Sequence, residues 1–152
     1  MKRCTLILLA GLLLAGLTFA GDSSCPEQTF TDPNSYGYGI DPNEIAVDPV
    51  SGQRLMLGVV TTEIGVPWEY EGYGCDPDGD TMTFASEAEI AVDGAVYTLS
   101  GIVGQVGLSY YDVSVTDTPA DPNMTAYTRT GTVVVVGLPA NQPPVLCGGR
   151  PE

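Results

Sequence analysis

The chain has 152 residues, with 19 acidic and five basic residues, no histidine and a net charge of −14. A chain this acidic repels phosphate backbones, so we expect no nucleic-acid partner. Because it has no histidine and its one lysine is Lys2, it lacks the usual groups that activate a nucleophile, and we expect no enzyme.

Residues 1–20 have the pattern of an export signal. Lys2 and Arg3 precede an uncharged apolar stretch that ends at Ala20, and this stretch is shorter than the roughly 20 residues of a membrane helix. We therefore expect a secreted or cell-surface protein whose mature chain has no stable membrane span. An uncleaved anchor remains an alternative, and a lipid anchor on Cys25 is disfavoured by the polar residues before it.

Residues 21–43 predict an N-terminal extension. They contain turn sequences such as Asp32-Pro33-Asn34 and Asp41-Pro42-Asn43, without apolar periodicity. Aspartate accepts hydrogen bonds from its own downstream backbone and proline fixes φ, so each pair favours a turn. Only Ser86–Ala91, further along the chain, could form a short helical turn.

Residues 44–140 predict one all-β domain. Short apolar or alternating segments recur about every ten residues, bounded by Gly, Asp and Pro, which favours an antiparallel β-sandwich of about seven strands. The run Val133–Val136 indicates a strand that is covered on both faces or lies in the interior of a sheet. The expected strands are Arg54–Thr61, Ile64–Tyr73, Thr81–Ala85, Glu89–Val92, Ala95–Leu99, Leu108–Thr116 and Thr130–Leu138.

Residues 141–152 predict a stiff C-terminal tail. Pro143 and Pro144 cannot continue a central strand and favour an extended backbone. The mid-strand Trp68 is expected in the core, although a surface position that stacks on a sugar remains possible.

Three alternating carboxylates form the most distinctive polar motif. Asp76, Asp78 and Asp80 are separated by Pro77 and Gly79, which bend the chain. Calcium takes six to eight oxygen ligands, several of them from carboxylates, so this spacing predicts a calcium loop. A polar turn without a metal is the simpler alternative, because turns favour the same residues.

An EF-hand would use the same aspartates. Counting from Asp76 places Glu87 at the twelfth position, but the sixth is Thr81 where that loop requires glycine. The flanking segments alternate as strands do, which argues against paired helices.

The segment Cys75–Phe84 resembles the DPDGD segment of bacterial cadherin-like and dystroglycan-type cadherin-like domains. Other stretches in matching order are Thr62–Tyr70, Tyr111–Asp117 and the linker-like Asn141–Val145, although we find no second copy and Cys75 stands where a small residue is commoner.

The resemblance implies an immunoglobulin/cadherin-like Greek-key sandwich that acts as an extracellular calcium-stiffened adhesion or spacer module. In such a sandwich the sixth strand ends at Asp117 beside the acidic loop, so Asp117 is the expected fourth ligand. Affinity is expected on the order of 10⁻⁴–10⁻³ M. Its partners would be other extracellular domains, surface glycans or surface proteins. The alternative function is a carbohydrate- or protein-binding β-sandwich without a functional metal.

Three cysteines remain after the predicted signal is removed: Cys25, Cys75 and Cys147. An oxidising compartment favours disulfides, and an odd number leaves one thiol over. Cys75 adjoins the acidic loop, near the point where the N-terminal extension is expected to join the sandwich. We therefore expect a Cys25–Cys75 bond, with Cys147 unpaired or linked to another chain.

Overall fold

The computed structural model describes residues 30–142, so the predicted signal peptide, Cys25 and Cys147 lie outside the described residues. The described chain forms two short 3₁₀ turns, η1 (Pro33–Tyr36) and η2 (Pro42–Glu44), followed by seven strands. The strands are β1 (Met56–Glu63), β2 (Pro67–Tyr73), β3 (Thr81–Ser86), β4 (Glu89–Asp93), β5 (Val96–Ile102), β6 (Gly107–Thr118) and β7 (Thr128–Leu138).

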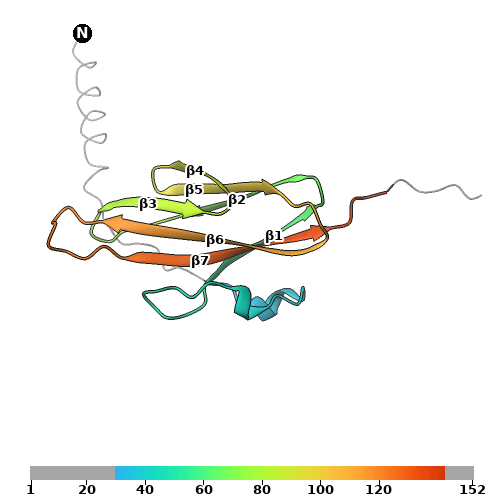
Figure 1. The fold of residues 1–152 in the computed structure, drawn as a ribbon, viewed down its shortest axis with the longest axis horizontal. Coiled ribbons are helices and arrows are strands. Elements are labelled where there is room, and N and C mark those ends of the chain that lie inside the picture. The colour runs from blue at the N-terminus through green and yellow to red at the C-terminus, as the bar shows by residue number, and fades with distance from the viewer. Residues whose placement is uncertain (1–29, 143–152) are drawn as a thin grey trace, which may run out of the picture.

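The seven strands form two sheets, which confirms the predicted all-β sandwich. One sheet has the order β1-β7-β6-β3 and the other has the order β2-β5-β4. Figure 1 shows the two sheets as stacked layers, with the chain crossing between them from β1 to β2, β2 to β3, β3 to β4 and β5 to β6. This crossing pattern is the Greek-key arrangement of immunoglobulin-like sandwiches.

The sandwich is antiparallel except at one edge, where β1 pairs with β7 in parallel. The first and last strands belong to the same sheet but are joined through all the others, so no hairpin constrains their relative direction. The predicted strands are otherwise confirmed within a few residues. The helical turn expected at Ser86–Ala91 is wrong, because Ser86 ends β3 and residues 89–91 begin β4.

The core between the sheets forms around Trp68, Leu99 and Val133, which are at most 2% exposed. The Trp68 ring packs against Tyr111, with ring centroids 4.9 Å apart. Trp68 is therefore a core residue, and a sugar cannot reach it.

The outer face of the four-stranded sheet is covered as well. Ile40 and Ile45 of the N-terminal segment pack with Met56 and Val134 in a second buried cluster. Residues 131–137 of β7 are all buried, because alternate side chains face the two clusters and neighbouring strands flank β7 on both sides. The prediction that Val133–Val136 is covered on both faces is confirmed.

Within residues 30–142 there is no helix with the length and apolar character needed to cross a membrane.

Candidate metal centre

The acidic loop between β2 and β3 forms a tight turn around Asp76. One oxygen of the Asp76 carboxylate, Oδ1, accepts hydrogen bonds from the backbone N–H groups of Asp78, at 2.8 Å, and Asp80, at 3.2 Å. Gly79 donates its N–H to the Asp76 carbonyl and has φ of 78°, a value that favours glycine. The turn therefore draws the start and end of the motif together around one carboxylate.

Asp117 lies near the same turn, on β6, the strand that pairs with β3. It lies opposite Met82 in the strand register, one residue before the end of β6. The loop that follows β6 is tied to both carboxylates, because Tyr127 donates its N–H to Asp117 and Ala120 donates its N–H to Asp80, the latter at 3.2 Å. Two loops and a strand end thus meet at one pole of the sandwich.

The structure brings together Asp76, Asp80 and Asp117, all half-buried, with one carboxylate oxygen of each within 4.8 Å of the others. Two ligands of one calcium ion can be at most about 5.2 Å apart, since each Ca–O distance is about 2.3–2.6 Å. The spacing is therefore compatible with a shared ion. Asp78, the remaining residue of the predicted set, is exposed and is not part of this group.

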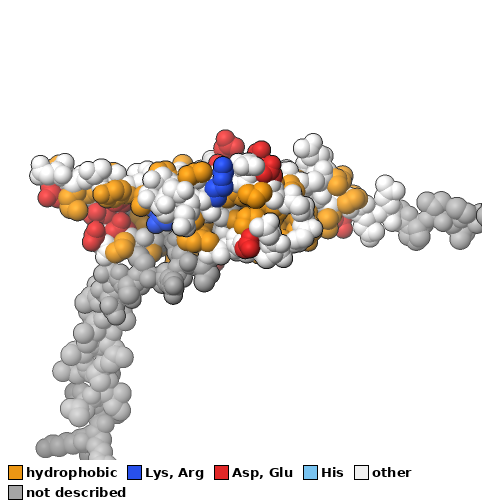
Figure 2. Space-filling model, turned by 90° about the horizontal axis from the view of Figure 1, so that it is seen from below, with side chains coloured by type: hydrophobic (Ala, Val, Ile, Leu, Met, Phe, Trp, Pro, Cys, Tyr) orange, Lys and Arg blue, Asp and Glu red, His pale blue; other side chains and the backbone are white. Residues whose placement is uncertain are grey.

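Among residues 30–142 no cationic side chain neutralises these carboxylates. The only cations in that range are Arg54 and Arg129. Arg54 donates to the carbonyls of Asn43 and Ile45, and Arg129 forms an ion pair with Asp48. Figure 2 shows one group of acidic side chains toward the left end of the molecule, where the β6–β7 loop lies in Figure 1, and others along its upper and lower edges.

The surroundings also decide against an EF-hand. The acidic loop is flanked by β2 and β3, and the expected twelfth ligand, Glu87, follows the end of β3. An EF-hand needs a helix on each side of its loop. The strands supply the alternating pattern that the sequence already indicated.

Sequence reasoning missed a second acidic site, at Asp48. This side chain is fully buried and is held by the Arg129 guanidinium at 2.9 Å, by the Ser51 hydroxyl at 2.7 Å and by the Thr130 N–H at 3.1 Å. Burial by itself raises the pKa of Asp48, but hydrogen bonds from Ser51 and Arg129 outweigh it and lower the pKa to about 2.

One signal in the sequence pointed to this pair. The chain beyond residue 20 has only three arginines, and Arg129 lies four residues before the buried valine run that begins at Val133. A scarce cation at the end of a buried strand is a good candidate partner for a buried acid.

Cys75 lies two residues beyond the end of β2, directly before the aspartates of the acidic loop, and is disulfide-bonded. The predicted partner, Cys25, lies outside the described residues, so the pairing stays a prediction.

Comparisons with protein-family models, with curated proteins and with solved structures find no match to this chain. The resemblance to cadherin-like domains therefore depends on the motif residues themselves, together with the sandwich on which they lie.

Proposed function

We propose that this chain is an exported calcium-binding, cadherin-like module that serves in cell-surface adhesion or as a structural spacer. The observation that carries the proposal is the meeting of Asp76, Asp80 and Asp117 within 4.8 Å of one another at one pole, with no described cation to balance them. Carboxylates this close repel one another, and a bound cation removes that repulsion.

The donor set favours calcium over other common metals. It consists of carboxylates, the ligands that calcium prefers, and the chain has no histidine for a zinc or copper site. Three carboxylates provide three to six oxygens, and backbone carbonyls or water would complete a shell of six to eight. Few protein ligands and an open pole suit the weak affinity of extracellular calcium modules, on the order of 10⁻⁴–10⁻³ M.

Calcium bound here would stiffen one end of the module. Asp76 and Asp80 belong to the β2–β3 loop, while Asp117 lies beside the β6–β7 loop. The β3–β6 ladder ends at Thr81 and Thr118, and beyond it the Ala120 N–H donates to Asp80. A shared ion would add a stronger link between the two loops. An end that becomes rigid only in calcium suits a spacer or adhesion module, whose task is to hold an orientation outside the cell.

A calcium titration followed by thermal unfolding tests the proposal. With a dissociation constant of about 1 mM, 10 mM calcium should raise the free energy of unfolding by about 1.4 kcal/mol, because the ion binds only the folded state. This corresponds to a rise of roughly 3–5 °C in Tm. Magnesium at the same concentration should have a smaller effect, since it sheds its water reluctantly.

The matched variants are the triple substitution Asp76→Asn, Asp80→Asn and Asp117→Asn, and the single control Asp78→Asn. Asparagine keeps the Oδ1 acceptor that holds each loop, so the triple variant should fold but lose the calcium-dependent rise. Asp78→Asn should keep it, because Asp78 lies outside the group. A rise that survives in the triple variant, or a wild-type protein indifferent to calcium, would refute the proposal.

The second candidate, a protein-binding sandwich without a functional metal, is favoured by the opposite pole. There Val66, Ile102, Val106 and Leu138 are between 40% and 61% exposed. In segments 63–67, 101–107 and 137–142 the one charged residue is Glu63. In a chain this acidic, such a surface is where a second copy could approach with least repulsion.

Sedimentation velocity of the wild type and of Ile102→Asp, both in chelator, tests this candidate. Concentration-dependent association that the substitution removes would support it. A monomer at every concentration would exclude self-association through this pole.

A further inference from the structure

The strands β1, β2, β3 and β4 form the edges of the two sheets in the described part of the chain. Among them only β3 has no charged residue; the other edges carry Glu63 in β1, Glu69 and Glu71 in β2, and Glu89 and Asp93 in β4. Proteins usually protect an exposed edge with charges, because its unpaired backbone groups can pair with another strand. In a chain this acidic, the uncharged β3 is the edge that a partner strand can approach with least repulsion.

The register of β6 shows which backbone groups of β3 are unpaired. The Asp117 N–H donates to the Tyr127 carbonyl just before β7, at 3.1 Å, so the backbone groups of its neighbour Thr116 point the other way, to β3. Thr116 lies opposite Thr83, and the hydrogen-bonding direction alternates along a strand. The two residues that flank Thr83 therefore point their N–H and C=O groups away from β6. No strand within residues 30–142 pairs with β3 on that side (Figure 1).

The outward face of β3 is also neutral. Thr81, Thr83 and Ala85 are exposed on it. Thr83 lies in one row with Thr116 of β6 and Thr128 of β7. The hydroxyls of Thr116 and Thr128 hydrogen-bond to each other, with their Oγ1 atoms 2.8 Å apart. Cross-strand threonine pairs stabilise a sheet, so Thr83 offers the same contact to a further strand.

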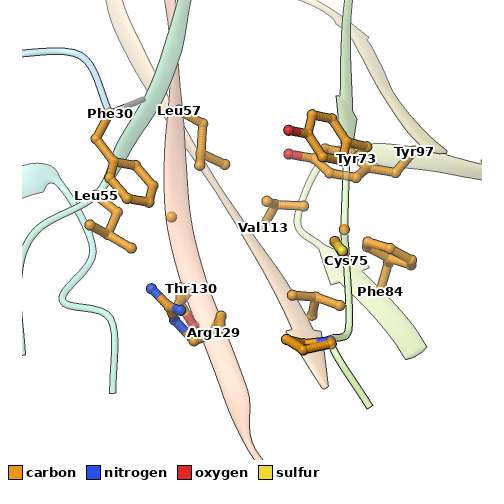
Figure 3. Close-up of a pocket in the computed structure, with 14 residues that line it drawn as sticks. Phe30, Leu55, Leu57, Tyr73, Cys75, Phe84, Tyr97, Val113, Arg129 and Thr130 are labelled. Atoms are coloured by element: carbon orange, nitrogen blue, oxygen red, sulfur yellow. The ribbon is translucent and has the colours of Figure 1, made fainter. Parts of the chain in front are cut away.

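The inner face of β3 is held by the core. Phe84 lines a cavity of about 420 Å³ between the two sheets (Figure 3), and its ring packs against Tyr97 with ring centroids 5.4 Å apart. This packing ties β3 to the other sheet, so its free edge is ordered before a partner arrives. An ordered edge loses less conformational entropy on pairing than a mobile segment would.

We propose that two copies of this chain join through β3, with the two strands antiparallel and Thr83 facing Thr83 of the second copy. On each side of this threonine pair, Met82 of one copy lies opposite Phe84 of the other, and each such pair exchanges both backbone hydrogen bonds. The contact is isologous, so the same residues serve both copies. The two four-stranded sheets become one continuous sheet, and the row of threonines runs across it.

The antiparallel direction follows from charge. Because β3 begins directly after Asp80, a parallel pair would bring the two acidic loops side by side. The antiparallel pair puts these loops at opposite ends, and Asp80 then lies opposite Ser86 of the other copy rather than opposite an acid. At an ionic strength of about 0.15 M, exposed charges further apart than about 8 Å are largely screened. The pairing needs no calcium, so it is independent of the proposed metal site.

A cysteine cross-link in chelator tests the register. Residues that face each other in a non-hydrogen-bonded antiparallel pair have Cα atoms about 4.5 Å apart, a separation that a disulfide can bridge. Thr83→Cys should therefore form at least about tenfold more covalent dimer on mild air oxidation than the matched control Thr81→Cys. Thr81 is exposed on the same face but lies opposite Ala85 of the other copy, so its own two Cα atoms are about 14 Å apart. Wild type gives the background from its native cysteines.

Sedimentation velocity in chelator tests the surface. Wild type should show a monomer–dimer equilibrium, and Thr83→Lys or Thr83→Glu alone should each weaken it about fivefold or more, because like charges then face each other. An equimolar mixture of these two variants should restore the dimer, since lysine then faces glutamate. Ile102→Asp, at the opposite pole, should leave the dimer intact. Thermal unfolding verifies that each variant is folded, and exposed substitutions of this kind change stability little.

A wild type that stays monomeric at every concentration would overturn the proposal and leave the edge to a strand of another protein. Equal cross-linking of Thr83→Cys and Thr81→Cys would overturn it as well, because the link would then report random collision. A dimer that Ile102→Asp abolishes would assign association to the opposite pole instead. A calcium response lost while the dimer persists would refute the proposed function and leave this inference standing.

Discussion

The molecule has two acidic sites that differ in how their charge is compensated. Asp48 is fully buried, and the protein itself surrounds it with a guanidinium, a hydroxyl and backbone N–H groups. Asp76, Asp80 and Asp117 are half-buried, and each accepts backbone hydrogen bonds on only one oxygen. The first site is complete within the fold, while the second leaves carboxylate oxygens for an external ligand.

This difference separates two uses of the same side chain. A buried carboxylate must be fully satisfied, because an unpaired charge in the interior is strongly destabilising. A group of carboxylates at a pole tolerates incomplete compensation, because water and ions reach it. We therefore expect stability to depend on Asp48 in every buffer, and on Asp76, Asp80 and Asp117 mainly through the metal.

The largest effect should follow Asp48→Ala, which leaves Arg129 without its partner and removes the acceptor for Ser51 and Thr130. Loss of one member of a buried pair costs about 3–5 kcal/mol, and since Arg129 is partly exposed we expect the lower end. Urea unfolding should give the same loss in calcium and in chelator. A loss that appears only in calcium would mean that the two sites are coupled.

The second-largest effect on stability should come from acid, which protonates Asp48. Its folded pKa of about 2 lies below the ordinary value of 3.8, so the stabilisation is fully present above pH 4 and is lost as pH falls toward 2. The contribution is about 2 kcal/mol. The stability difference between wild type and Asp48→Asn, measured by urea unfolding from pH 5 to pH 2, should shrink by that amount; a constant difference would contradict it.

Substitutions of Asp76, Asp80 or Asp117 should have a smaller effect on stability, with opposite sign in chelator and in calcium. In chelator, Asp76→Asn, Asp80→Asn or Asp117→Asn should raise stability by about 0.5 kcal/mol, because each removes repulsion between half-exposed charges. In saturating calcium the same variants should be less stable than wild type, since they lose a ligand. Equal effects in both buffers would show that no ion binds there.

The smallest effect should be at Asp78. Its side chain is exposed and only its backbone N–H holds the turn, so Asp78→Asn should change stability by less than about 0.5 kcal/mol in either buffer. A calcium response lost in this variant would move the proposed ion toward Asp78 and away from Asp117.

Much of the fold was predictable because it depends on local patterns. Alternating apolar residues mark β2 and β6, and the uninterrupted valines of β7 indicate a strand covered on both sides. The acidic loop was predictable as a turn because Pro77 fixes its backbone φ and Gly79 adopts a positive φ without strain, and both are typical of turns. The parallel pairing of β1 with β7 was not, because strand direction at a sheet edge depends on the path of the whole chain.

The two acidic sites also separate what the sequence determines from what the tertiary structure decides. The sequence by itself determined that carboxylates crowd residues 76–80, that few cations are available, and that short strands bounded by turns form a sandwich. These properties follow from residue types and their spacing. The sequence also placed Asp117 near Asp76 and Asp80, but only the tertiary structure decided that Asp78 stays in solvent and that Asp48 meets Arg129 across 81 residues. Which carboxylates meet is decided by strand register and by the packing of loops, and these form only when distant segments fold together.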